Sequence, residues 1–143
     1  MDLFTVGYEA ATLPDVIGRL RAAGVQLLID VRAVASSRRP GFSKTALSAS
    51  LAEAGIDYLH LRALGTPSEG RAAARAGRTA EMRAIFAAHL EEPAAQLALL
   101  HAAEAAAARP SALLCYEKDA AVCHRAMLAD LLSQRLGFAI HDL

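Results

Sequence analysis

The chain has 143 residues, and its 15 Lys and Arg are balanced by 15 Asp and Glu. A chain of this length is typical of one domain that buries roughly two-thirds of the surface its unfolded form would expose. We therefore expect a single domain over residues 1–143. A formal net charge of +0 excludes a protein that depends on overall charge to attract nucleic acid or a membrane, so any basic patch must be local.

The sequence also predicts where the protein resides. The opening MDLFTVGYEA has neither the basic flank nor the apolar core of a signal peptide, and no apolar run is long enough to cross a bilayer. We expect a cytoplasmic protein with no membrane partner. In a reducing compartment the two cysteines are expected to be thiols rather than a structural bridge, each acting as a buried side chain, a nucleophile or a metal ligand.

A strand and a helix open the predicted fold. Apolar residues at 3–6 indicate a short strand, and Thr12 then has the character of a helix N-cap, with Pro14 in the first turn and Gly24 as the stop. The apolar run at 25–31 predicts a second strand. Its lack of alternation is typical of a strand covered on both faces, as in a parallel sheet.

The next stretch, RAVASSRRPGFSK at 32–44, has neither helical nor strand periodicity. It predicts a loop at the carboxyl end of the second strand. A helix over 46–54 follows, Gly55 ends that helix, and residues 56–61 predict a third strand.

The middle of the chain is the least regular part. Residues 64–78 contain three glycines and three arginines, and we expect a segment that is partly helical or mobile. Two helices follow over 79–90 and 93–107. They are separated at Pro93, because proline disfavours helix continuation and restricts the residue before it.

The last elements are a strand, a helix and a strand. Residues 111–116 predict a buried strand, Asp119 is the candidate N-cap of a helix over 120–136, Gly137 ends it, and 138–143 form the final strand. The order is β-α-β-α-β-(αα)-β-α-β. Such alternation predicts an α/β fold with three layers around a mostly parallel five-stranded sheet. Two strand orders compete, and a rhodanese-like or otherwise atypical order is favoured over a flavodoxin-like one.

The candidate site lies in LLCYEKDAAVCHR at 113–125, between the fourth strand and the helix after it. Loops at the carboxyl edge of the sheet bind ligands in α/β proteins. Four residues of this stretch are candidate catalytic residues, with the carboxyl or the imidazole moving protons. They are Cys115, Cys123, Glu117 and His124.

Cys115 is the candidate nucleophile. A following helix N-terminus, Lys118 and Arg125 are the kinds of groups that lower the pKa of a thiol. The alternative is an inert thiol at the end of a buried strand. Cys123 is either the resolving thiol for Cys115 or a core residue.

Arginines after the second strand predict anion binding. A guanidinium matches the geometry of phosphate or carboxylate, so we expect a small anionic ligand, either phosphate-containing or nucleotide-like. The candidate substrate-binding residues are Arg32, Arg38, Arg39, Arg125, Tyr8 and His60. A solvated basic face is the alternative for the arginines, a core role is the alternative for His60, and Asp30 is expected to neutralise an arginine.

A non-catalytic module that binds nucleotide or nucleic acid is the second hypothesis. Tyr8, Phe42 and Tyr58 would supply stacking groups beside the arginines. The neutral overall charge and the few aromatic residues make nucleic acid the less favoured partner.

A Cys/His metal site is the third hypothesis, because thiolate and imidazole suit zinc. Its ligands would be Cys115, Cys123 and His124, with Glu117 or His60. The chain lacks the paired cysteine spacing of ordinary structural zinc sites, and we assign no metal ligand and no cofactor from the sequence.

Four segments together carry a family resemblance. They are TVGYE at 5–9, LLIDVRAVASSRRPGFSK at 27–44, GIDYLHLRALG at 55–65 and LLCYEKDAAVCHR at 113–125. This ordered set resembles family 488 of the domains of unknown function. The resemblance implies a soluble α/β protein of bacterial type with two cysteines of suspected catalytic importance and no settled reaction.

A looser likeness is to rhodanese-type sulfurtransferases. LIDVR at 28–32 is similar to a strand of those domains, and Cys115 lies at a strand end before a helix, as their nucleophile does. Their active-site loop has glycine soon after the cysteine and arginine close behind, whereas Tyr116-Glu117-Lys118-Asp119 follows here. The sequence therefore favours a cysteine-dependent enzyme without naming its reaction.

Overall fold

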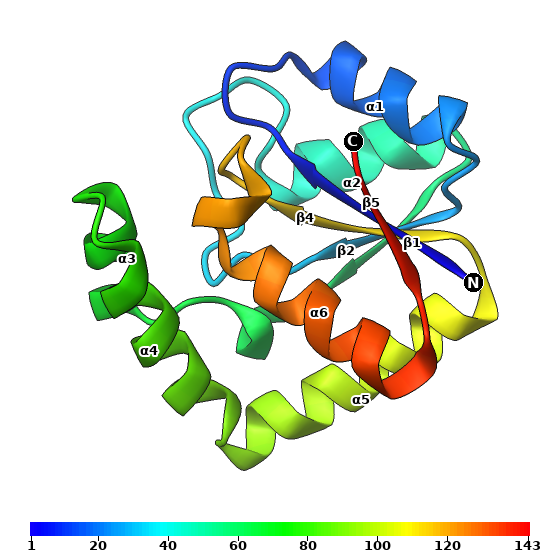
Figure 1. Cartoon of the computed structure of the whole chain (residues 1–143). Coiled ribbons are helices and arrows are strands. Elements are labelled where there is room, and N and C mark those ends of the chain that lie inside the picture. The colour runs from blue at the N-terminus through cyan, green and yellow to red at the C-terminus, as the bar shows by residue number, and fades with distance from the viewer.

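A computed structural model describes all 143 residues and contains one five-stranded sheet (Figure 1). The strand order is β3-β2-β4-β1-β5, and every neighbouring pair is parallel. The strands are β1 (Asp2–Gly7), β2 (Leu27–Asp30), β3 (Asp57–His60), β4 (Ser111–Cys115) and β5 (Ala139–Asp142). The predicted α/β class with a parallel sheet is confirmed, and the flavodoxin-like order 2-1-3-4-5 is wrong for this chain.

Helices cover both faces of this sheet, which gives the predicted three layers (Figure 1). The helices are α1 (Leu13–Ala22), α2 (Lys44–Glu53), α3 (Ser68–Arg75), α4 (Thr79–Leu90), α5 (Pro93–Ala108) and α6 (His124–Leu136). α1 and α2 pack on one face, and α5 and α6 lie on the other (Figure 1). None of the helices is both long enough and apolar enough to span a membrane.

Alternating residues of the strands feed two separate hydrophobic cores, because successive side chains of a strand point to opposite faces. In β2, Leu28 belongs to the core under α1 and α2, whereas Ile29 belongs to the core under α5 and α6. In β4, Leu113 and Leu114 divide in the same way. The continuous apolar runs of these two central strands are therefore explained by burial on both faces.

Two predicted helix signals are confirmed. The hydroxyl of Thr12 accepts a hydrogen bond from the backbone N–H of Asp15, 3.3 Å away, and so caps α1. Gly137 ends α6 in the left-handed conformation, with φ 72°, which glycine adopts without steric cost.

The helix predicted over 120–136 begins later than expected. Ala120–Val122 forms a 3-10 turn capped by Asp119, whose carboxylate accepts from the N–H of Ala121 at 2.9 Å. Cys123 is extended, with φ −117° and ψ 145°, and α6 starts at His124. The sequence around Cys123 favours a helix and so does not reveal this break. The cause of the break is tertiary, since the extended backbone places Cys123 beside Cys115 of β4.

The segment at 64–78, expected to be partly helical or mobile, contains the helix α3 over Ser68–Arg75. Its chain passes directly over the loop that follows β2, since a Cβ on Gly65 would overlap the backbone of Ala33. α3 then packs against α4. Glycine at 65 therefore permits the close approach that forms one wall of the site.

Candidate functional site

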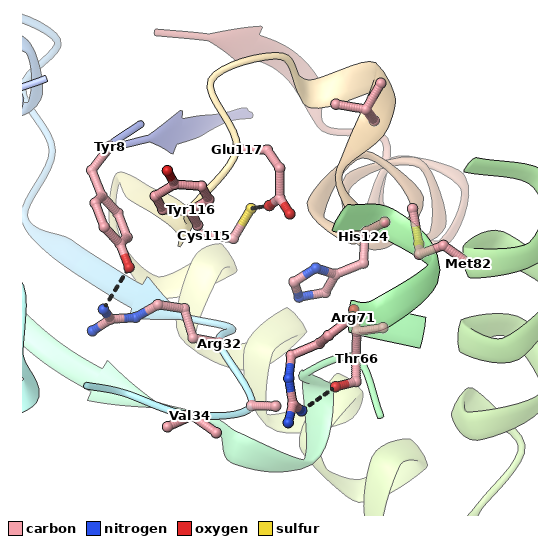
Figure 2. A pocket seen from close by; sticks show the side chains of 13 residues that line it. Tyr8, Arg32, Val34, Thr66, Arg71, Met82, Cys115, Tyr116, Glu117 and His124 are labelled. Carbon is pink, nitrogen blue, oxygen red and sulfur yellow. Dashed lines mark hydrogen bonds between the residues drawn. The ribbon is translucent and has the colours of Figure 1, made fainter. Parts of the chain in front are cut away.

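A cavity of about 130 Å³ lies at the carboxyl edge of the sheet (Figure 2). The register places Gly7 of β1 beside Cys115 of β4, and Asp30 of β2 beside Leu114, so the loops after three strands meet here. Five of the ten predicted site residues line the cavity. They are Tyr8, Arg32, Cys115, Glu117 and His124. The arginine-bearing loop and the cysteine loop thus converge on one pocket.

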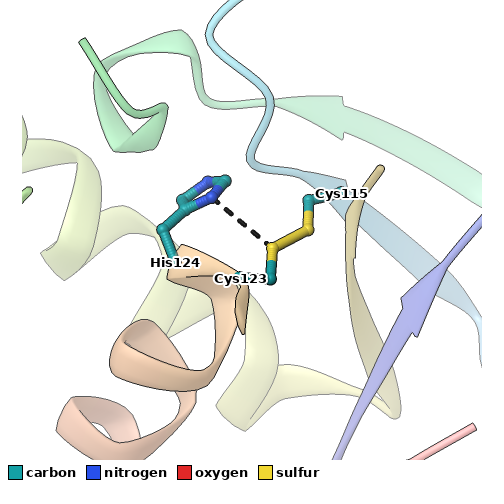
Figure 3. A group of neighbouring side chains, drawn as sticks. All are labelled: Cys115, Cys123 and His124. Atoms are coloured by element: carbon teal, nitrogen blue, oxygen red, sulfur yellow. Dashed lines mark hydrogen bonds between the residues drawn. A yellow bond between two sulfur atoms is a disulfide. The ribbon is translucent and has the colours of Figure 1, made fainter. Parts of the chain in front are cut away.

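Cys115 and Cys123 meet through their sulfurs, which form a disulfide in this structure (Figure 3). The sequence favoured two thiols over a bridge. Both residues are buried, and their Cα atoms are 7.5 Å apart. This separation exceeds the range of about 4.4–6.8 Å that disulfides usually span. The two sulfurs are therefore adjacent, although the Cα atoms that carry them are farther apart than in a usual disulfide.

Arg125 is fully buried beside the first of these sulfurs. Its Nη1 lies 3.3 Å from Cys115 Sγ and also donates to the carbonyl of Glu117, and its Nη2 donates to the carbonyl of Lys118 at 3.1 Å. No carboxylate oxygen lies within 4.0 Å of the guanidinium. Burial lowers the pKa of Arg125 from its ordinary value. A buried cation without a carboxylate partner therefore contacts Cys115.

Gly7 makes this arrangement possible. A Cβ at this position would overlap the carbonyl oxygen of Glu117 and would lie 2.8 Å from Arg125 Nη1. Because glycine has no Cβ, the loop after β4 can fold back over the end of β1. Nothing in the sequence predicted this role for Gly7.

Glu117 is the acid-base group nearest to Cys115. Its Oε2 lies 3.4 Å from Cys115 Sγ, and the residue is half-buried at the cavity (Figure 2). Burial raises the pKa of Glu117 above its ordinary value. A carboxyl group with a raised pKa, in contact with sulfur, is suited to exchange a proton with it.

His124 contacts the second sulfur. Its Nε2 lies 2.8 Å from the carbonyl oxygen of Val31, and its Nδ1 lies 3.6 Å from Cys123 Sγ (Figure 3). Because a carbonyl only accepts, we assign the proton to Nε2, which leaves the lone pair of Nδ1 directed at sulfur. Burial lowers the pKa of His124 to about 4, so the imidazole is neutral at pH 7.

Three soft donor atoms therefore converge on one point. Cys115 Sγ, Cys123 Sγ and His124 Nδ1 all lie within 4.8 Å of one another. Thiolate and neutral imidazole are the ligands that zinc prefers in proteins. These three residues are the group in the chain that could hold such a metal.

Arg32 lines the cavity, but most of its donors are already engaged. Its Nε and Nη2 bind the carboxylate of Asp30 at 2.9 Å and 2.7 Å, and its Nη1 donates to Tyr8 Oη at 3.1 Å and to the carbonyl of Phe42 at 2.7 Å. Asp30 also accepts from Tyr58 Oη at 2.6 Å. The expectation that Asp30 neutralises an arginine is confirmed.

The other predicted anion-binding residues lie outside the cavity. Arg38 is exposed, and Arg39 donates to the carbonyl of Ala11 at 2.6 Å, beside a different cleft. His60 contacts the backbone carbonyl of Arg32 at 2.8 Å and so supports the loop without lining the pocket.

The proposed base-stacking residues are also occupied. Tyr8 and Phe42 stack on each other with ring centroids 4.4 Å apart, and both are buried. Neither ring face is therefore free to receive a nucleotide base, which removes two of the three groups that favoured nucleic-acid binding.

Sequence reasoning missed Arg71, which lies on α3 and faces the cavity (Figure 2). Its Nη1 donates to the carbonyl of Thr66 at 2.9 Å, and it forms no ion pair with a carboxylate. Its side chain therefore brings an unneutralised cation to the pocket. The only signal in the sequence was the repetition of arginine at 71, 75 and 78, which pointed to no particular position.

The fold and site together define a parallel α/β protein with a two-cysteine pocket at the carboxyl edge of its sheet. The family described as Domain of unknown function DUF488 matches residues 12–132, and the chain belongs to this family. A search of curated proteins and a search of solved structures each return no match.

Proposed function

We propose that the protein is a cytoplasmic cysteine-dependent enzyme in which Cys115 is the nucleophile. The observation that carries this proposal is the contact of Arg125 Nη1 with Cys115 Sγ at 3.3 Å, in a buried setting without a carboxylate partner. An opposite charge at this distance favours the ionised form of a thiol. In the reduced protein the Cys115 thiolate would be a counter-ion in direct contact with Arg125, a place that no carboxylate takes.

Glu117 would act first as the general base and then as the general acid. The thiol of Cys115 can lose its proton to the carboxylate, whose Oε2 lies 3.4 Å away. The thiolate then forms a bond to the electrophilic atom of the substrate, and the bond from that atom to the leaving group breaks. The leaving group takes the proton from Glu117.

Cys123 would complete the reaction when the electrophilic atom is sulfur. Its sulfur meets that of Cys115 in this structure, so it can attack the mixed disulfide and release the rest of the substrate as a thiol, with the backbone adjusting because the Cα atoms are 7.5 Å apart. The product is the Cys115–Cys123 disulfide, and two electrons have passed to the substrate. A small thiol reductant would then return the pair to its starting form.

The cavity favours a small substrate with an anionic group and an apolar part. Arg71 brings the unneutralised positive charge, whereas Val34, Met82 and Tyr116 provide apolar walls. Because Arg32 is neutralised by Asp30, we assign anion recognition to Arg71.

Alkylation of Cys115 tests the proposal. In the Cys123→Ser variant the thiol at 115 is free, and we expect iodoacetamide to modify it at pH 7 well above the rate of a free cysteine, because a larger fraction is thiolate. The rate measured from pH 4 to 10 gives the thiol pKa, which we expect below about 8.5. A rate no higher than that of free cysteine, in a variant shown to be folded, would remove the main support.

A further inference from the structure

We propose that the reduced protein binds one zinc ion through Cys115, Cys123 and His124. The proposal rests on the donor set and its geometry, and it does not depend on the catalytic role proposed for Cys115. Zinc bonds are about 2.3 Å to sulfur and about 2.0 Å to imidazole nitrogen, so tetrahedral ligands lie under ~4 Å from one another. The three donor atoms already lie within 4.8 Å of one another, and reduction of the disulfide would free the two sulfurs to separate around a common centre.

The backbone separation of the two cysteines supports a bridging ion. Their Cα atoms are 7.5 Å apart, beyond the usual reach of a direct sulfur–sulfur link. Thiolates that share a tetrahedral zinc have their sulfurs about 3.8 Å apart, which adds to the distance that the two side chains can span. The distance between the backbone of β4 and the start of α6 therefore suits two sulfurs that bind one ion between them.

The imidazole of His124 is oriented as a zinc ligand. Zinc-bound histidines donate their other ring N–H to a carboxylate, a backbone carbonyl or water, which fixes the tautomer and the ring plane. Here Nε2 contacts the carbonyl of Val31 at 2.8 Å, and Nδ1 is directed at Cys123 Sγ (Figure 3). The outer support that a ligating histidine needs is therefore in place.

The cavity leaves one side of this site open. Cys115 and His124 both line it, and Glu117 lies on the same side (Figure 2). Three protein ligands with an open fourth position are the arrangement of catalytic zinc, whereas structural zinc is closed by four ligands. Water, Glu117 or a substrate atom could occupy the fourth position.

Zinc and the disulfide exclude each other at this site. Both cysteines must be thiolates to bind the ion, so binding releases whatever protons their thiols still carry and leaves the two sulfurs unavailable for a mutual bond. An organic disulfide that oxidises the pair would take up two electrons from the thiolates and two protons from water, become two thiols and release the ion. The site would therefore hold zinc only while the pair is reduced.

Zinc titration with a chromophoric chelator as competitor tests the proposal. We expect reduced wild-type protein to bind one equivalent and the disulfide form to bind none. Each of Cys115→Ser, Cys123→Ser and His124→Asn should weaken binding at least about 100-fold, since loss of an outer-shell partner alone costs 10–100-fold. His101→Asn, an exposed change of the same chemistry, should leave the affinity unaltered.

Two measurements on wild-type protein keep the test decisive if His124→Asn fails to fold. Cobalt should give the tetrahedral d–d bands and the charge-transfer intensity of two thiolates, and one equivalent of zinc should protect both cysteines from iodoacetamide. Stoichiometric binding by the disulfide form, unprotected cysteines at saturating zinc, or full affinity in folded His124→Asn would overturn the proposal. Slow alkylation of Cys115 in Cys123→Ser would instead count against the catalytic proposal, so the two failures are distinguishable.

Discussion

Arg125 and Cys115 form a contact in which a buried guanidinium has sulfur, and no carboxylate, as its closest candidate for a counter-charge. The two residues are ten positions apart and come from different elements, α6 and β4. Cys115 Sγ therefore contacts a cation directly, whereas Cys123 Sγ contacts the neutral imidazole of His124, with Nδ1 3.6 Å away.

Removal of the positive charge at 125 should therefore raise the thiol pKa of Cys115. In a Cys123→Ser background, Arg125→Met should raise it by about 1–2 units, since an opposite charge at this range shifts a pKa by that order. The alkylation rate at pH 7 should fall by up to about tenfold per unit, the full factor applying where the thiol pKa is well above 7. Arg125→Lys retains the charge and should retain most of the rate. Equal rates in the Met and Lys variants would show that the guanidinium does not act on the thiol.

Arg71 should select anionic reagents at the pocket. The rate of Cys115 with iodoacetate, divided by its rate with neutral iodoacetamide, reports attraction of a carboxylate independently of thiol reactivity. Arg71→Gln should lower this ratio several-fold, and the effect should shrink with added salt because exposed charges are screened. Arg75→Gln, on the same helix and exposed, is the matched control. A ratio that falls equally in both variants would indicate a general surface potential.

His124 should make the disulfide form of the protein acid-sensitive. Burial holds the pKa of His124 at about 4, against 6.5 when it is exposed, so between these values the unfolded chain binds more protons than the folded one. Its contribution to the free energy of unfolding is complete above about pH 6.5 and is lost as the pH falls toward 4. The loss totals about 3 kcal/mol. Urea unfolding in chelator across this range should show a smaller decline for His124→Gln.

Gly7→Ala should destabilise the protein, because the added Cβ would overlap the carbonyl of Glu117. We expect a loss of about 1–3 kcal/mol in the free energy of unfolding and displacement of the loop after β4. Gly18→Ala, within α1, meets nothing within 4 Å and should stabilise by up to ~1 kcal/mol. Urea titrations of both variants measure the difference, and equal stabilities would contradict the proposed overlap.

Asp30→Asn should cost far more stability than a matched change on the surface. It leaves the charge of Arg32 buried without its ion partner, which typically costs about 3–5 kcal/mol. Asp57→Asn breaks the exposed ion pair with Arg109 and should cost at most ~1 kcal/mol. Thermal or urea unfolding of the two variants checks the ranking.

The elements of the fold were largely predictable because they depend on local signals. The apolar runs of β2 and β4, the Thr12 cap and the Gly137 stop all act within one turn or strand. Strand order depends on which distant segments pair, and nothing within a single segment encodes it. The late start of α6 escaped prediction because its cause, the extended backbone of Cys123, lies in a sequence that otherwise favours helix.

The location of the site could be predicted from the sequence, but only some of the residues that line it could. Parallel strands bring their carboxyl ends to one edge of the sheet. The predicted strands therefore placed Arg32 and Cys115 at the same cavity. Arg71 was missed because the path of 64–78 depends on tertiary contacts, including the close approach of Gly65 to Ala33. The partners of Arg39 were equally hidden, since Ala11 lies 28 positions away.

The guanidinium of Arg125 donates hydrogen bonds to the carbonyls of Glu117 and Lys118 in the loop after β4, and it also contacts the sulfur of Cys115. If Cys115 is a thiolate in the reduced protein, oxidation removes the negative charge from that sulfur and leaves the loop carbonyls as acceptors for the cation. The redox state of the cysteine pair would then act on the loop that carries Tyr116, which is 44% exposed. The position of this exposed loop would then differ between the reduced and the oxidised protein.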